Sequence, residues 1–330
     1  MKTNVDPRTG SMKAMAADGY GPLDRLRPIS IPLPVPGKGE VRVRVHASAL
    51  NPADYKVLLG TLKFLHARNR PLVVGYDFSG VIDAVGPGVT TFTVGQGVFG
   101  FLPYSPGNKQ GAFAEALIAR VDRITAKPAS VSHQQAAAIA TPGATCIQAM
   151  RELGKLRKGQ HVAITGASGG VGLLAVAIAK RLGASVTAIG SGPGLQLAKA
   201  AGADHVIDRK VNAVPGSLKG SFDLVFDPAA VHRWAHWKRL IKPKGHFVTT
   251  LPSMGFLADK LTSLASSHGV HWVNVKADAA HLELLGQWLA DGLVVHVDHV
   301  VEVRNVASSL ERLHRGGVLG RIVVDVPGKF

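Results

Sequence analysis

The feature of this sequence that most constrains its fold is a glycine-rich turn between an apolar strand and an apolar helix. Residues 161–165 read HVAIT, the turn GASGG follows over 166–170, and an apolar helix is predicted over 170–182. This order of strand, turn and helix is the setting that a dinucleotide-binding fingerprint requires. The chain is therefore predicted to contain a Rossmann unit. A glycine turn with a purely structural role is the alternative.

The residues of this turn have separate expected roles. Gly169 lets the backbone approach a pyrophosphate, and Gly172 lets the helix pack closely on the sheet. Free N–H groups at the start of the helix, together with the helix dipole, hold the phosphates. Ala167 stands where the first glycine of the fingerprint is usual. The turn residues that we predict to bind the cofactor are Ala167, Ser168, Gly169, Gly170, Val171 and Gly172.

The choice between NAD and NADP depends on the end of the next strand, about 20 residues further along. An acidic residue there would bind the ribose 2′-hydroxyl of NAD, but this strand is followed by Ser191. A hydroxyl leaves room for a 2′-phosphate, and Arg209, after the third strand, supplies a positive charge. NADPH is therefore the predicted cofactor. Leu251 and Arg321 are also predicted to contact it.

The alternation of strands and helices divides the chain into two parts. The first 125 residues contain short strands with glycine and proline between them, which is typical of a barrel-like or sandwich domain. The clearest of these strands are predicted over 41–45, 75–88 and 94–100. A helix is predicted from residue 132, and strands then alternate with helices, which favours a doubly wound parallel sheet. Its strands are predicted over 161–165, 185–189, 205–207, 222–226, 246–250 and 270–275.

The C-terminal tail is predicted to return to the first domain, because a Rossmann unit is already complete before it. The β-rich domain is therefore predicted to cover residues 1–125 and 281–330, and the α/β domain residues 126–280. Residues 1–11 are polar, without the apolar core of an export signal, and are interpreted as a loose extension. A cytoplasmic location is the default prediction.

The charge of the chain is strongly positive: 38 Lys and Arg against 22 Asp and Glu, a formal net charge of +16. Such an excess can indicate nucleic-acid or membrane-surface binding. Here the basic residues are scattered, without a run of five, so we predict that the surface attracts small anions and that nucleic acid is not a partner. The apolar run over 171–179 is about half the length of a membrane span, so no integral membrane segment is predicted.

Seven short segments together resemble the zinc-independent quinone oxidoreductase branch of the medium-chain dehydrogenase/reductase superfamily. They are residues 48–54 (SALNPAD), 75–80 (GYDFSG), 85–89 (VGPGV), 111–115 (GAFAE), 143–145 (GAT), 166–172 and 202–208 (GADHVID). The resemblance implies an α/β fold with a GroES-like β-rich catalytic domain and a doubly wound Rossmann domain. It implies reduction of quinones or α,β-unsaturated carbonyl compounds with NADPH, and a contact between Thr145 and the nicotinamide. It also implies a homodimer that pairs through residues 270–275.

The resemblance also bears on zinc. Zinc-dependent relatives carry a cysteine where Asn51 stands, a histidine where Tyr76 stands and a second cysteine near Thr141. None of these ligand types is present here, and the chain has one cysteine, Cys146, which we interpret as a small buried residue. Two histidine pairs, at 232/236 and 268/271, are interpreted as structural. We therefore predict that the protein has no metal site.

Without a metal, a side chain has to stabilise the oxygen on which negative charge develops. The candidate donors are Asn51, Tyr55, Tyr76 and Lys56, and each of them also has a structural interpretation. Asp54 is expected to brace their loop, and the proton is expected from a side chain or from water.

Two other functions remain open at this point. One is a nucleotide-binding regulatory protein that keeps the fold without turnover. The other is a zinc-free alcohol or carbonyl dehydrogenase. The substrate depends on the loops over 58–70 and 253–267, whose residue types do not define a pocket.

Overall fold

The computed structural model describes residues 10–212, 214–216, 218, 221–252 and 254–330, which fall into two compact units. The first unit runs to Thr141 and resumes at Lys276, and the second comprises Pro142–Val275. The predicted boundaries at 125/126 and 280/281 differ from these. The first boundary differs because helix α2 (His133–Ile147) begins in the first unit, where the Gln135 side chain makes hydrogen bonds of 3.0 and 2.9 Å with the backbone of Val295.

The first unit is built around strand β3 (Glu40–Ala49), and the alternation expected over 41–45 fails at Arg42, which is 5% exposed because it pairs with Asp83 at 2.7 Å. Val41, Val43 and Val45 are buried, because their side chains share one face of the strand. The tail returns as predicted, since β16 pairs with β3 in antiparallel fashion. The sheet order is β15 (Val297–Glu302), β16 (Arg321–Asp325), β3, β5 (Asp77–Val85), β6 (Gly97–Phe101) and β8 (Ile124–Ala126), with β7 (Ala116–Arg120) paired to β3.

A second, smaller sheet of the first unit joins β2 (Arg27–Pro32), β1 (Ser11–Ala17) and β4 (Leu72–Val73). Because Ser11 opens β1 and the Gly10 carbonyl accepts a hydrogen bond from Leu33, these two residues are not part of a loose extension. The rest of the expected extension, residues 1–9, lies outside the described residues. The helical segments of this unit are η1 (Leu23–Arg25), α1 (Pro52–Leu58), η2 (Lys63–Leu65), η3 (Val121–Arg123), α7 (Ala279–Ala290), η5 (Val303–Asn305) and α8 (Val306–Arg315).

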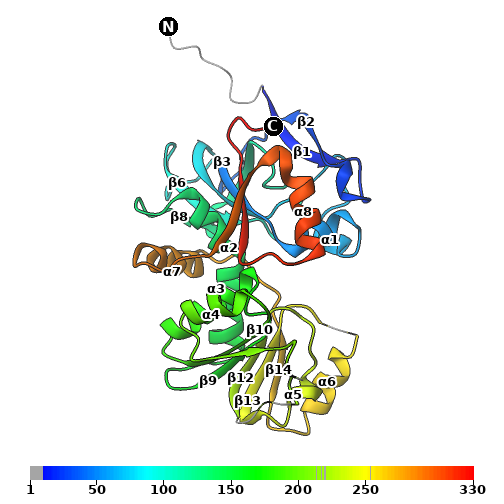
Figure 1. Ribbon diagram of the computed structural model, residues 1–330. Helices are drawn as coiled ribbons and strands as arrows, with labels where there is room; N and C mark the ends of the chain where they lie inside the picture. The colour runs from blue at the N-terminus through cyan, green and yellow to red at the C-terminus, as the bar shows by residue number, and fades with distance from the viewer. Residues whose placement is uncertain (1–9, 213, 217, 219–220, 253) are drawn as a thin grey trace. The chain divides into compact units, whose positions relative to one another are not determined.

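The second unit contains the predicted parallel sheet (Figure 1). Its order is β11 (His205–Asp208), β10 (Ser185–Gly190), β9 (His161–Ile164), β12 (Phe222–Asp227), β13 (Ile241–Thr249) and β14 (Gly269–Trp272). This order reverses between β9 and β12, as a doubly wound sheet does at its switch point. The helical segments are η4 (Gln148–Leu153), which continues α2, and α3 (Gly170–Arg181), α4 (Gly194–Ala200), α5 (Trp234–Trp237) and α6 (Phe256–Ser263).

Helix α6 lies inside the segment 253–267 that the sequence analysis treated as a loop. Leu257 and Leu261 of this helix and Leu264 at its C-cap are exposed, so these apolar residues do not form a buried helix face. No helix in the described part of the chain is long and apolar enough to cross a membrane.

Candidate functional site

The glycine turn of the second unit has the geometry that its sequence predicts. Gly166 has a φ of +55°, a left-handed conformation that favours glycine. A Cβ placed on Gly172 would lie 2.1 Å from the Gly166 carbonyl oxygen, so only glycine allows α3 to approach the strand this closely. At Gly169, by contrast, a Cβ would have 3.5 Å to its nearest neighbour, that same oxygen. Gly172 therefore allows the close packing of α3 on the strand, and Gly169 leaves the space beside the start of α3 open.

Gly169 is the N-cap of α3, and no side chain caps this end of the helix. The first N–H groups of a helix have no partner within it, and they carry the positive end of the helix dipole. A phosphate is a suitable acceptor for such groups, and a side chain at Gly169 would take up space beside them. The residues of the turn therefore fit the pyrophosphate of a dinucleotide.

The turn is held by a buried carboxylate that the sequence analysis missed. Asp227, at the end of β12, is fully buried and accepts hydrogen bonds from the Thr165 hydroxyl and, at 2.8 Å, from the backbone N–H of His232. The backbone N–H of Ala167 donates to the Ile189 carbonyl at 3.0 Å, which joins the turn to β10. The one signal for Asp227 in the sequence is its position, because it is an acidic residue at the end of an apolar strand.

The other predicted cofactor residues of this unit follow the ends of the parallel strands. Ser191 follows β10, Arg209 follows β11 and Leu251 comes two residues after β13. In a parallel sheet the carboxyl ends of the strands meet at one edge, where ligands bind. Ser191 is half-buried and Arg209 is exposed, and the Arg209 N–H donates to the Gly190 carbonyl at 2.9 Å. The structure therefore brings Ser191 and Arg209 to neighbouring strand ends. Thr145 lies on α2, 5% exposed.

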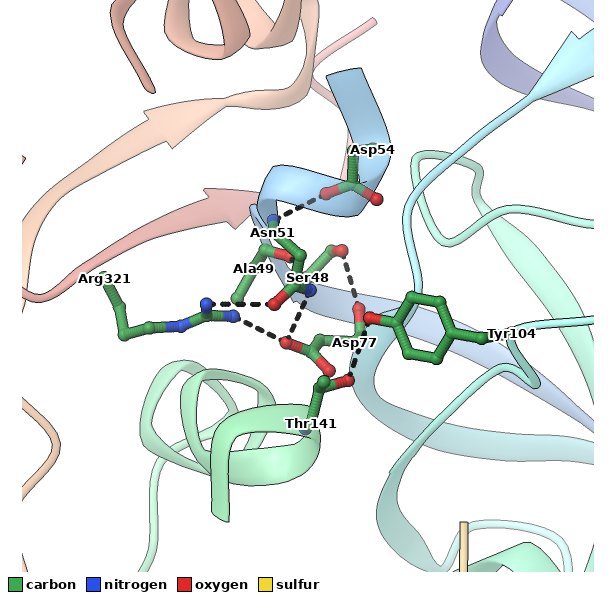
Figure 2. A network of polar contacts seen from close by, with 8 residues as sticks. All are labelled: Ser48, Ala49, Asn51, Asp54, Asp77, Tyr104, Thr141 and Arg321. Carbon is green, nitrogen blue, oxygen red and sulfur yellow. Dashed lines mark hydrogen bonds and ion pairs between the residues drawn. The ribbon is translucent and has the colours of Figure 1, made fainter. Parts of the chain in front are cut away.

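The first unit contains a buried polar network, which we define by the side chains of Ser48, Asn51, Asp54, Asp77, Tyr104, Thr141 and Arg321 (Figure 2). At its centre is an ion pair of 2.6 Å between Arg321 Nη2 and Asp77 Oδ2, with these side chains 4% and 0% exposed. The backbone N–H of Thr141 donates to Asp77 Oδ1 at 2.9 Å, and the Ser48 hydroxyl donates to the Asp77 carbonyl at 2.6 Å. Asp77 is thus held by three other elements of this unit.

Asn51 has both ends of its side chain engaged within this network. Its Oδ1 accepts from Arg321 Nη1 at 3.0 Å, and its Nδ2 donates to Asp77 Oδ2 at 3.0 Å and to the Ala49 carbonyl at 3.4 Å. The sequence analysis expected this amide to donate to a substrate or to a ribose. The structure differs, because the buried ion pair is within reach of both ends of the amide. A catalytic role for Asn51 stays a prediction.

Asp54 braces this loop as expected. It is the third residue of α1, and its Oδ2 accepts from the Asn51 N–H at 2.6 Å, which completes a capping box. Burial raises the pKa of Asp54 to about 8, although the backbone N–H of Asn51 acts against this shift. Asp54 therefore holds a proton at neutral pH.

Tyr76 and Tyr104 form a stacked pair beside the network, with ring centroids 4.0 Å apart and planes inclined by 21°. Tyr76 is fully buried, and its hydroxyl donates to the Leu65 carbonyl at 3.2 Å. The Tyr104 hydroxyl lies 3.3 Å from Thr141 Oγ1. Burial, followed by the Asp77 charge, raises the pKa of Tyr104 well above its usual range. Tyr104 was missed because it belongs to a loop segment without a motif.

The remaining predicted donors lie on α1 and are half-buried. The Tyr55 ring is 4.8 Å from the His314 ring, and burial raises the pKa of Tyr55. Burial lowers the pKa of Lys56. Within the described part of the chain, no hydrogen bond joins either side chain to the buried polar network, so their roles stay predictions.

The position of Arg321 differs from the one expected for a residue that binds the cofactor together with the glycine turn. It belongs to β16 of the first unit, and two of its guanidinium nitrogens bond to Asp77 and Asn51. Burial of a guanidinium without a carboxylate would be costly. The ion pair with Asp77 therefore allows the Arg321 side chain to lie inside the first unit. Contact between Arg321 and the cofactor stays a prediction.

Comparisons with known proteins agree with this architecture. The model of the alcohol dehydrogenase GroES-like domain matches residues 37–129, and one described as zinc-binding dehydrogenase matches residues 201–324. The mitochondrial NAD(P)H oxidoreductase RTN4IP1 of Bos taurus is 30% identical, over 98% of this chain and 91% of its own length. The trans-enoyl reductase pgmF of Aspergillus terreus is 30% identical, over 86% of this chain and 85% of its own length.

A solved structure, that of the quinone oxidoreductase from Coxiella burnetii, is similar over nearly the whole chain. Its TM-score is 0.87 at 27% identity, and the match covers 96% of this chain and 100% of the other. The predicted fold class, a GroES-like domain with a Rossmann domain, is confirmed.

One of these family models is named for zinc, but the residues present do not fit that metal. Structural and catalytic zinc sites use thiolate, imidazole or carboxylate ligands. The three positions that the resemblance assigned to ligands are an amide, a phenol and a hydroxyl, at Asn51, Tyr76 and Thr141. The Arg321 cation already lies against Asn51. Among the described residues, no group of three or more His, Cys, Asp or Glu is placed to hold a metal ion.

The histidine pairs of the sequence have other neighbours. The His232 ring meets Trp237 edge to face at 5.6 Å, and the His268 ring meets Trp234 at 6.0 Å. His271 lies 3.3 Å from His246, ring nitrogen to ring nitrogen. Cys146 is buried with its Sγ 3.7 Å from the Val171 carbonyl, and burial raises the pKa of its thiol.

Proposed function

Because this chain belongs to the quinone oxidoreductase branch of the medium-chain dehydrogenase/reductase superfamily, we propose that it reduces quinones or α,β-unsaturated carbonyl compounds with NADPH, without zinc. The observation that carries this proposal is the open, uncapped start of α3 behind Gly169, with Ser191 and Arg209 at the neighbouring strand ends. The names of the Coxiella and Aspergillus proteins support the two acceptor classes.

In this proposal the second unit binds and orients the cofactor. The first N–H groups of α3 hold the pyrophosphate, Ser191 and Arg209 hold the 2′-phosphate, and Thr145 and Leu251 contact the rest of the molecule. Bound NADPH supplies the hydride. The first unit supplies the groups that stabilise the acceptor oxygen, and Asn51, Tyr55, Tyr76 and Lys56 are the proposed candidates.

The function is tested by NADPH oxidation, followed at 340 nm, with a quinone, an enone and an aldehyde in parallel. Turnover with the quinone or the enone supports the proposal. Tight NADPH binding without turnover of any acceptor would contradict it and would favour a regulatory protein of the same fold. Turnover of the aldehyde alone would favour a zinc-free carbonyl dehydrogenase.

Cofactor choice is tested separately. The Ser191→Asp variant places a carboxylate against the 2′-phosphate, and we expect it to prefer NADH by at least ~10-fold, because juxtaposed like charges cost several kcal/mol. Titrations of both cofactors against the wild-type protein and the variant measure the preference. Equal affinities of the wild-type protein for NADPH and NADH would remove this part of the proposal.

Zinc content is tested by elemental analysis and by activity after treatment with a strong chelator. We expect no stoichiometric zinc and unchanged activity. One zinc per chain, lost together with activity, would overturn the zinc-free proposal.

We also propose a homodimer that pairs through β14. This strand is the last of its sheet, and Trp272 at its end is 42% exposed. Leu257 and Leu261 of the neighbouring α6 are 69% and 59% exposed, and Leu264 at its C-cap is 76% exposed. An uncovered strand edge beside exposed leucines favours burial against a second copy. Light scattering at micromolar concentration measures the mass, and a monomer mass would contradict the dimer.

The cytoplasmic location remains a proposal as well. The Bos taurus relative is named as mitochondrial, and fractionation of the source cells would decide between these compartments.

A further inference from the structure

The first unit contains a cavity of about 320 Å³ whose charged lining residues are all basic. Two residues that follow β1 line it, together with the segment 63–72, which runs from η2 into β4. Its cations are Lys63, Arg68 and Arg70, and no acidic residue of the described chain lines it. A cleft lined by one sign of charge raises the local concentration of ions of the opposite sign. The cavity is therefore suited to an anion.

The three cations are not neutralised by other side chains. All three are exposed, and across the described part of the chain their side chains make no hydrogen bond and no ion pair. The carboxylate of Asp18, which precedes the cavity residue Gly19, is already paired with Arg27 at 2.9 Å. Positive charges around one cavity repel one another, and a bound anion would relieve this repulsion.

A second cavity of the first unit, of about 300 Å³, has a different charge balance. Its lining includes the cations of Arg120 and Arg123, but also the carboxylate of Glu40. Arg120 is in addition paired with Asp122 at 3.0 Å. The protein itself therefore offsets part of the positive charge of this second cavity, which it does not do for the first.

The cationic cavity is partly preorganised. The Asn69 amide, between the two arginines, donates to the Pro71 carbonyl at 3.0 Å and to the Lys109 carbonyl at 3.1 Å, which holds the segment in place. The guanidinium of Arg70 lies against Gly19, because a Cβ at this glycine would be 3.5 Å from Arg70 Nε and Nη2. Gly19 has a φ of +124°, which favours glycine and leaves this space to Arg70.

We propose that this cavity binds a phosphate monoester with a small apolar ester group. Arginine binds phosphate oxygens through paired N–H donors, and lysine adds a compact charge. A phosphate monoester carries about −1.5 to −2 charges at pH 7, which three cations can balance. These two kinds of donor correspond to Arg68 and Arg70 on the one hand and to Lys63 on the other.

The size of the cavity is the argument for an ester over free phosphate. Its volume of about 320 Å³ corresponds to roughly ten water molecules at ~30 Å³ each, which is more than a phosphate group fills. The lining also includes Ala67 and Leu72, which are 8% and 1% exposed. An apolar group beside these side chains would gain from leaving water.

The binding experiment is a calorimetric titration of the wild-type protein with phenyl phosphate. Saturating NADP⁺ is present throughout, so that the glycine turn of the second unit is occupied and does not take up the probe. We expect one binding site per chain. Inorganic phosphate, titrated in the same way, should bind more weakly because it lacks the apolar group.

Substitutions of the arginines test the location of the site. Arg68→Gln and Arg70→Gln should each weaken phenyl phosphate binding about 10-fold, the effect of one hydrogen-bonded charge, without a change in melting temperature. Arg70→Lys keeps the charge but not the paired donors, so its affinity should be intermediate. The matched control is Arg123→Gln, which removes the same charge from the second cavity and should keep wild-type affinity.

Three results would contradict this site, and none depends on whether the protein reduces an acceptor. Equal weakening in Arg123→Gln and Arg68→Gln would show a general attraction to a chain of net charge +16. Loss of phenyl phosphate binding on addition of NADP⁺ would place the probe at the glycine turn. Equal affinities for phenyl phosphate and inorganic phosphate would overturn the ester and leave the cavity with free phosphate.

Discussion

The glycine turn of the second unit and the buried polar network of the first unit build sites in opposite ways. The turn offers backbone N–H groups, and its geometry depends on the lack of a side chain at Gly169 and Gly172. The network consists of side chains whose polar groups are bonded to one another, with Asp77 and Arg321 at the centre. Substitutions in the turn should therefore act on cofactor affinity, and substitutions in the network on stability.

The largest expected effect is that of Arg321→Leu. It leaves the Asp77 carboxylate buried without its cation, which costs ~3–5 kcal/mol of the free energy of unfolding. Urea denaturation measures the loss. The control is Arg27→Leu, which breaks an ion pair with Asp18 whose side chains are 60% and 75% exposed, and it should cost no more than ~1 kcal/mol. Equal losses in both variants would contradict the importance of the buried pair.

The next prediction concerns pH and Asp54. Its pKa is raised from 3.8 to about 8, so between these values the folded state holds a proton that the unfolded state releases. Stability therefore falls as pH rises through this window, and this contribution is constant below and above it. In Asp54→Asn the contribution is absent, so the stability of the wild-type protein relative to the variant should decline from pH 5 to pH 8.

Urea denaturation at each pH measures this difference in the free energy of unfolding. The exposed Asp18→Asn serves as the charge control. A difference between the wild-type protein and Asp54→Asn that does not change with pH would show that Asp54 is ionised in the folded state.

In the turn, Gly172→Ala and Gly169→Ala should have different effects. The new Cβ of Gly172→Ala meets the Gly166 carbonyl at 2.1 Å, so the helix has to shift, at a cost of ~1–3 kcal/mol, and NADPH binding is lost with it. The Cβ of Gly169→Ala has ordinary contacts in the protein and stands beside the free N–H groups. This variant should keep its melting temperature and bind NADPH more weakly. If it bound NADPH as the wild-type protein does, the phosphates would not lie at this end of α3.

Within the buried polar network, Asn51→Ala is expected to lower stability less than Arg321→Leu does. Arg321 and Asp77 each lose one hydrogen bond but keep each other, which costs ~1–2 kcal/mol. The sequence analysis predicts in addition a lower kcat with little change in NADPH affinity. Melting temperature, NADPH affinity and kcat measured on one preparation separate the two roles. An unchanged kcat would leave Asn51 with a structural role alone.

The sequence by itself determined the local parts of this protein. The turn from Gly166 to Gly172 follows from the residues in it, because a left-handed φ and a close backbone approach depend on glycine at particular positions. The burial of Val41, Val43 and Val45 on one face of β3 and the succession of strands and helices from residue 161 also follow from nearby residues. These features predicted both domains and the return of the tail to the first one.

Only the tertiary structure decided how distant side chains meet. Asp77 and Arg321 are 244 positions apart, and Asn51 and Arg321 are 270 apart, so no local pattern indicates that they bond. The same holds for Asp227 beneath the glycine turn and for Tyr104 beside Thr141. The sequence alone does not show whether a polar side chain faces solvent or a partner inside the protein. Its role is set by burial, which requires each polar group to find a partner that the fold brings within reach.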